Sequence, residues 1–106
     1  SGSGLKADNI AGVLSRISSL KNLRVLALHE NFLRTDGAKT LASYIANGTF
    51  PKLQVVDIKD NYISSNGALA VAKAATKLKG FKRLEIDFNT ISQWAISEIE
   101  QIFGEA

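Results

Sequence analysis

The sequence predicts a single α/β domain built as a right-handed solenoid, with short parallel strands on a concave side and helices on a convex side. One nine-residue frame occurs three times, at spacings of 30 and 28 residues. A stretch with apolar residues at helical spacing follows each copy. A fixed period of this length indicates a repeat architecture, because one unit cannot bury its own apolar face and must stack on the next.

The three copies of the frame predict three strands. They read LRVLALHEN at 23–31, LQVVDIKDN at 53–61 and FKRLEIDFN at 81–89, with apolar residues at the first, fourth and sixth places. Alternation of the fourth and sixth places is typical of a strand with one buried face, so Leu26 and Leu28 are expected in the core. The residues between them are expected to face outward.

An asparagine closes each copy of the frame, and its predicted role is structural. The chain must bend away from the strand here, and each buried backbone group without a sheet partner would cost about 1–3 kcal/mol. An amide side chain both donates and accepts hydrogen bonds. Asn31, Asn61 and Asn89 are therefore expected to form a ladder that satisfies the backbone of adjacent turns.

The helical stretches are expected to begin at Gly37, Gly67 and Ala95, six residues after each asparagine. Asp36 and Asn66 stand directly before the first two and are predicted to cap them. A further helical stretch, NIAGVLSRISSL at 9–20, precedes the first strand and has no strand of its own. The chain is therefore expected to begin inside a repeat.

These boundaries divide the chain into about three repeats and a partial one. The predicted units are a partial repeat at 5–22 and repeats at 23–52, 53–80 and 81–106, while SGSG at 1–4 is interpreted as an expression scar. Trp94 is expected to cover the core at the last repeat. Because the first repeat lacks its strand, we expect either a homodimer through the N-terminal edge or a frayed first helix.

Composition excludes several classes of site. The 106 residues contain no cysteine and one histidine, His29, which argues against a disulfide framework, a thiolate metal site and a histidine zinc site. No phosphate loop or hydrolase motif occurs, so neither a cofactor nor an active site is expected. No apolar run approaches the roughly 20 residues of a membrane span. The chain is interpreted as a cytoplasmic protein that binds neither membrane nor nucleic acid.

The repeat frame, LxxLxLxxNxL followed by xxxGaxxLa, resembles that of leucine-rich-repeat proteins of the ribonuclease-inhibitor type. The stretch at 84–106 is similar to the last repeat of the GTPase-activating proteins of Ran, the nuclear-transport GTPase. The matching positions are Glu98, Glu100, Phe103 and Glu105, and the departures are Gln93 and Trp94. The resemblance implies docking on Ran, whose own glutamine orients the attacking water. No catalytic residue of those activators maps onto this chain.

The residues predicted to bind a partner flank the buried strand positions. They are His29, Glu30, Asp57, Lys59, Asp60, Arg83, Glu85, Asp87 and Phe88. Because five are acidic and two are basic, while the whole chain carries +3, this face is expected to attract a basic protein surface. Ordinary solvated charges on a free sheet face are the alternative explanation.

The predicted function is that of a protein-protein interaction module formed by the C-terminal repeats of a Ran GTPase activator. The chain itself is not expected to be an enzyme. The alternative function is a non-enzymatic leucine-rich-repeat scaffold or sensor domain.

Overall fold

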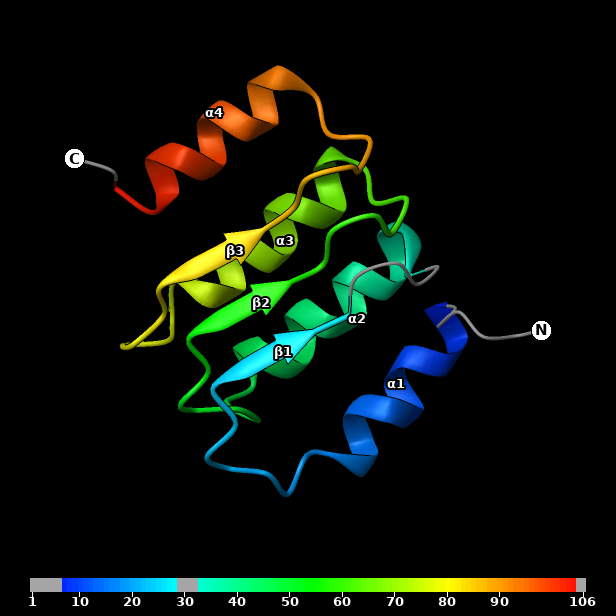
Figure 1. Cartoon of the computed structure of the whole chain (residues 1–106), viewed down its shortest axis with the longest axis vertical. Coiled ribbons are helices and arrows are strands. Elements are labelled where there is room, and N and C mark those ends of the chain that lie inside the picture. Colours follow the sequence, from blue (N-terminus) through cyan, green and yellow to red (C-terminus); the bar gives the residue numbers. More distant parts are fainter. Residues whose placement is uncertain (1–6, 29–32, 105–106) are drawn as a thin grey trace.

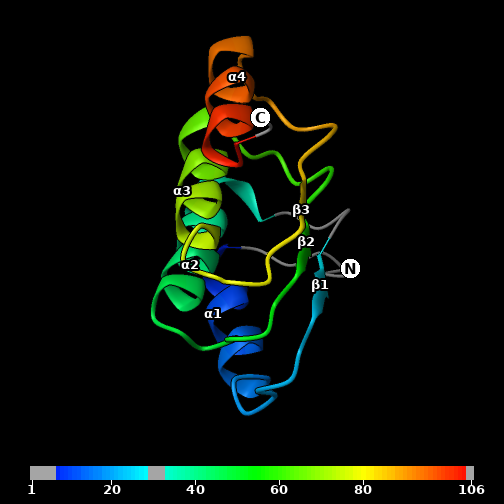
Figure 2. The same ribbon diagram turned by 90° about the vertical axis from the view of Figure 1, so that its left-hand side faces the viewer.

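A computed structural model describes residues 7–28 and 33–104 of the chain. The described residues form a three-stranded parallel sheet in chain order with four helices lying on one of its faces (Figures 1 and 2). This arrangement confirms the α/β class with parallel strands. The elements in order are α1 (Ala7–Arg16), β1 (Val25–Ala27), α2 (Arg34–Ala46), β2 (Val55–Asp57), α3 (Ser65–Ala75), β3 (Arg83–Glu85) and α4 (Gln93–Ile102).

Equivalent places of the repeated frame pair with one another across the sheet. Leu26 of β1 is in register with Val56 of β2, which is in register with Leu84 of β3. The ladder continues past the strands, because the Leu28 amide donates to the Asp57 carbonyl at 2.8 Å. A shift of one residue would turn these apolar side chains to the solvent, so the apolar pattern fixes the register.

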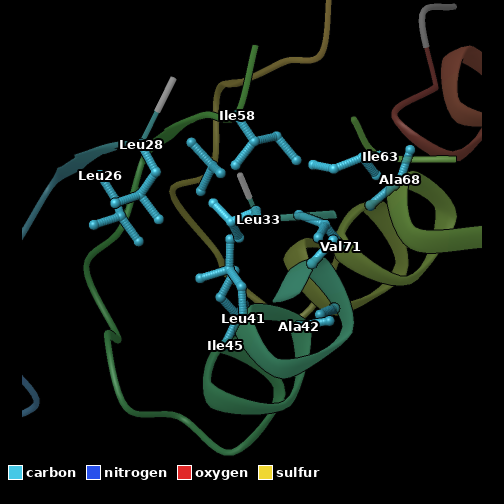
Figure 3. Close-up of a cluster of buried hydrophobic side chains, with 14 of the residues drawn as sticks. Leu26, Leu28, Leu33, Leu41, Ala42, Ile45, Ile58, Ile63, Ala68 and Val71 are labelled. Carbon is cyan, nitrogen blue, oxygen red and sulfur yellow. The ribbon is translucent and has the colours of Figure 1, made fainter. Parts of the chain in front are cut away.

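The core lies between the sheet and the helices. Figure 3 shows side chains of the strand segments, such as Leu28 and Ile58, pointing toward those of the helices, such as Leu41 and Val71. Ile58, Leu41 and Val71 are fully buried. Burial of one such side chain contributes about 1.5–3 kcal/mol. This contribution explains why strands of only three residues remain in a stable sheet.

The three helices that follow the strands begin earlier than the sequence predicts, and α4 begins at Gln93 instead of Ala95. α2 begins at Arg34 and α3 at Ser65, so Asp36 and Asn66 lie inside the first turn, and their prediction as caps is wrong. The cap positions are Leu33 and Ser64, and neither side chain caps its helix. Neighbouring chain segments satisfy these turns instead, since the Arg34 amide donates to the Asn61 carbonyl at 2.8 Å.

The first and last helices also differ from expectation. α1 ends at Arg16, four residues before the predicted end, yet its Ile10 and Leu14 are fully buried. In α4 the core is contacted by Ala95 and Ile99. Trp94 is 57% exposed, so the prediction that it covers the core is wrong. Position in a helix sets the direction of a side chain, and Trp94 precedes the buried row by one residue.

Candidate partner-binding face

The sheet has one face without helices, which we call the open face (Figure 2). Within the described residues, the open face carries the outward positions of each strand. The strand registers place them in rows, Val25 beside Val55 and Arg83, and Ala27 beside Asp57 and Glu85. Lys59 follows β2 on the same face, two residues after Asp57. The parallel register therefore brings together side chains that lie about 28 residues apart in the chain.

An ion-pair network spans β2 and β3 on the open face. The Lys59 Nζ lies 3.2 Å from Glu85 Oε1 and 3.8 Å from Asp57 Oδ2, and Arg83 Nε donates to Glu85 Oε2. The Glu85 carboxylate, with Asp57 next in effect, raises the pKa of Lys59 above its ordinary value. Arg83 first and Lys59 second hold the pKa of Glu85 below its ordinary value. Lys59 thus links Asp57 to Glu85, and Arg83 joins the network through Glu85.

This pairing changes which acids are available to a partner. Asp57 and Glu85 are matched by Lys59 and Arg83, so these four residues carry no net charge. Asp60 and Asp87 form no ion pair among the described residues, and both are exposed. They lie just beyond β2 and β3, where the Asp60 amide donates to the Asp87 carbonyl at 3.0 Å. The uncompensated negative charge therefore lies at the carboxyl edge of the sheet.

Large aromatic side chains are exposed at the same edge. Phe88, next to Asp87, is 80% exposed, and Tyr62 is 56% exposed. Both have positive φ, 64° and 57°, a region that costs a bulky L-residue about 1–2 kcal/mol. The Arg34 guanidinium lies 5.7 Å from the centre of the Tyr62 ring. Exposed aromatic and arginine side chains dominate protein interfaces, and strained backbone is concentrated at functional sites.

Two asparagines support the loops of this edge. The buried Asn61 side chain donates to the carbonyls of Leu28 at 2.9 Å and Lys59 at 3.0 Å, and it accepts from the Leu33 amide at 3.3 Å. One strand further, the side chain of Asn89 accepts from the Asn61 amide at 2.8 Å. Each asparagine thus ties its own turn to the turn before it, which holds the exposed residues in fixed positions.

The structure places most of the predicted partner-binding residues together. Asp57, Lys59, Arg83 and Glu85 lie on the open face, and Asp60, Asp87 and Phe88 lie at its carboxyl edge. The predictions for His29, Glu30 and Asn31 lie outside the described residues, as does that for residues 1–4.

Sequence reasoning missed Tyr62 and Arg34 as residues of this edge. A bulky aromatic residue directly after the frame asparagine was the available signal for Tyr62, because that position lies on the turn. The arginine had no comparable signal, since its contact with the ring depends on the folded turn.

The described residues of the open face and of its carboxyl edge offer charged and aromatic side chains. In residues 7–28 and 33–104, no group of three or more His, Asp or Glu side chains is placed to hold a metal ion. None of the described helices is long and apolar enough to cross a membrane. The open face presents a charge network, and its carboxyl edge presents free acids beside exposed rings.

The sequence of the chain is similar to part of a known GTPase-activating protein. Over 105 residues, 99% of the chain, the sequence is 34% identical to the RAN GTPase-activating protein 2 of Arabidopsis thaliana. Nearly the whole chain is therefore related to a part of this activator. The match spans 19% of the activator, so the chain corresponds to about a fifth of that protein's length. No protein-family model matches the chain.

A solved structure shares the fold. The actin-binding site 2 of leiomodin-1 superposes with a TM-score of 0.73, covering 90% of this chain and 55% of that one. The two sequences are 13% identical, so the likeness concerns the fold alone.

Proposed function

We propose that this chain is a Ran-binding repeat module of a GTPase activator. The observation that carries the proposal is the 34% identity over 105 residues to the RAN GTPase-activating protein 2. The repeated frame and the in-register parallel strands support a right-handed leucine-rich-repeat solenoid of the ribonuclease-inhibitor type. A cytoplasmic location is part of the same proposal.

In this proposal the chain contributes binding and not chemistry. Asp60 and Asp87 attract basic groups of Ran, because they are the uncompensated acids of the carboxyl edge. Phe88 and Tyr62 supply exposed apolar area that becomes buried in the complex. The GTPase retains the reacting groups, and the rest of the activator supplies whatever else hydrolysis requires. The chain by itself is therefore not an enzyme.

The first experiment measures binding of the chain to Ran loaded with a non-hydrolysable GTP analogue, by calorimetry. The test variant is Asp60→Asn with Asp87→Asn, since asparagine keeps the shape and tolerates positive φ. The matched control is Glu98→Gln with Glu100→Gln, which removes the same charge from α4. We expect the test variant to weaken binding about tenfold and the control to change it less than about threefold.

A second measurement distinguishes the activator from other repeat proteins. The chain is added as a competitor while the Arabidopsis activator stimulates GTP hydrolysis by Ran. Slower hydrolysis is the expected result. If the chain neither binds Ran nor slows hydrolysis, the alternative of a non-enzymatic scaffold or sensor domain replaces the proposal.

A further inference from the structure

A groove lies on the outer side of the helical layer, away from the open face. It runs between α2 and α3, which lie side by side (Figure 1), and its volume is about 430 Å³. We call it the α2–α3 groove. Its lining residues are Lys39, Ala42, Ser43, Ala46, Ala70, Lys73, Ala74 and Lys77.

Small side chains create this groove. The lining residues recur at the spacing of one helical face, i, i+3, i+4 and i+7, on both segments. The helices approach closely nearby, where a Cβ on Gly67 would lie 3.2 Å from the Cβ of Ala38. The alanines of the two facing helices then form a shallow apolar floor between α2 and α3.

The charged residues that line this floor are all lysines, and Asp36, one turn before Lys39 on α2, is not among the lining residues. Lys39, Lys73 and Lys77 are exposed, and none forms an ion pair within the described residues. No lining residue is acidic, and α3 contains no acidic residue. The lysines are therefore free to pair with negative groups that a partner brings.

We propose that the α2–α3 groove binds an acidic amphipathic helix of a partner protein. The apolar side chains of that helix would lie on the alanines, and carboxylates on its flanks would pair with Lys39, Lys73 and Lys77. Laying an amphipathic helix into an apolar groove is a common mode of peptide recognition. The helices that carry the groove lie on one side of the sheet and the open face lies on the other (Figure 2), so the two surfaces can be occupied at the same time. This inference does not depend on Ran binding.

The composition of the groove favours a helix over other anionic ligands. Insertion into a lipid surface uses large exposed apolar side chains, and the apolar lining here consists of alanines. Single-stranded nucleic acid is held by aromatic stacking, and the lining contains no aromatic residue. An apolar floor with lysines along it matches the apolar and acidic faces of a helix.

The test uses the full chain and a synthetic peptide of about 14 residues, long enough for about four helical turns. The peptide has leucine and alanine on one face and glutamate on its flanks. Binding is measured by fluorescence anisotropy, and circular dichroism verifies that each variant is folded. A scrambled peptide of the same composition provides the reference for non-specific attraction.

Three variants separate the contributions of charge and shape. Lys39→Glu with Lys73→Glu and Lys77→Glu is expected to weaken binding at least about tenfold. Ala70→Leu keeps all charges, fills the groove and is also expected to weaken binding. The matched control reverses three exposed lysines outside the groove, Lys52→Glu, Lys79→Glu and Lys82→Glu, and is expected to change the affinity less than about threefold.

The outcomes decide between a built groove and general attraction. Equal weakening in the groove and control variants, or equal binding of the scrambled peptide, would overturn the proposal. A parallel measurement uses vesicles of phosphatidylserine and phosphatidylcholine. If the vesicles bind and depend on the same three lysines while the peptide does not bind, a membrane surface replaces the helix as the ligand.

Discussion

Replacing Asn61 by alanine tests whether the asparagine ladder holds the turns of this fold. Asn61 is the buried polar side chain of the described core, with no exposed surface. Its amide group serves the carbonyls of Leu28 and Lys59 and the amide of Leu33. Alanine removes all three bonds and leaves these backbone groups without their partner side chain.

The expected cost follows from the burial of those groups. Each buried group that loses its partner costs about 1–3 kcal/mol. The bonds to Leu28 and Leu33 are buried, whereas the bond to Lys59 is partly buried, and the 3.3 Å bond to Leu33 is the longest of the three. We therefore expect Asn61→Ala to lower the free energy of unfolding by about 3–5 kcal/mol. A domain of this size has about 5–15 kcal/mol in total, so the loss is severe.

Urea unfolding followed by circular dichroism measures this loss. The transition midpoint is expected to fall by about 2 M, with a slope of about 1–3 kcal/mol per molar urea. Asn66→Ala is the matched control, because Asn66 is exposed in the first turn of α3, and its cost should stay within about 0.5 kcal/mol. A loss below about 1 kcal/mol for Asn61→Ala would refute the reasoning, since water or rearranged backbone would then satisfy the freed groups.

Three further predictions concern packing, pH and assembly. Gly67→Ala would place a Cβ 2.9 Å from Ile63 Cγ2, so this variant should lower the free energy of unfolding by about 1–3 kcal/mol. A Cβ on Gly12 would have its nearest neighbour 3.7 Å away, so Gly12→Ala should raise the free energy of unfolding by about 0.5–1 kcal/mol. Thermal melts that rank the two variants in the opposite order would contradict this. Because the pKa of Glu85 is lowered in the folded state, this carboxylate stabilises the fold at pH values above the ordinary glutamate pKa of about 4.3, and the contribution is lost as the pH falls below that value. Glu85→Gln should therefore lose less stability on acidification than the parent chain, as measured by urea titrations at several pH values. Among the described residues β1 lies at the edge of the sheet, and the sequence-based hypothesis of a homodimer through that edge or a frayed α1 remains to be tested. Sedimentation as a monomer, with residues 9–20 protected from hydrogen exchange, would exclude both.

The sequence predicted the α/β class and the strand positions because both follow from local pattern. Leu26, Val56 and Leu84 occupy one place of the repeated frame, and equivalent places meet when units stack. The repeat period therefore predicts which residues of different strands lie side by side in the folded chain. The alternation along each strand likewise predicted that its charged side chains lie on the open face.

The sequence was less informative about helix starts and about the exposure of Trp94. Asp36 and Asn66 are residue types that often cap helices, yet other chain segments satisfy the backbone amides at these helix starts. The Asn61 carbonyl accepts from the Arg34 amide, and the Thr35 hydroxyl accepts from the Ser64 amide. Hydrogen bonds between neighbouring units, and not the capping propensity of single residues, therefore set where these helices begin.

By itself, the sequence determined that this chain folds as stacked strand and helix units. The apolar residues of the repeated frame face the core together only when equivalent strand positions pair with one another. Only the tertiary structure decided which charges are free. Lys59 reaches Glu85 on the next strand, so Asp57 and Glu85 are neutralised while Asp60 and Asp87 remain available. Ion pairs and grooves form between units that are distant in the chain, and their distances depend on how closely the units approach. The lysine-lined α2–α3 groove exists for the same reason, because small residues on two helices meet only after folding.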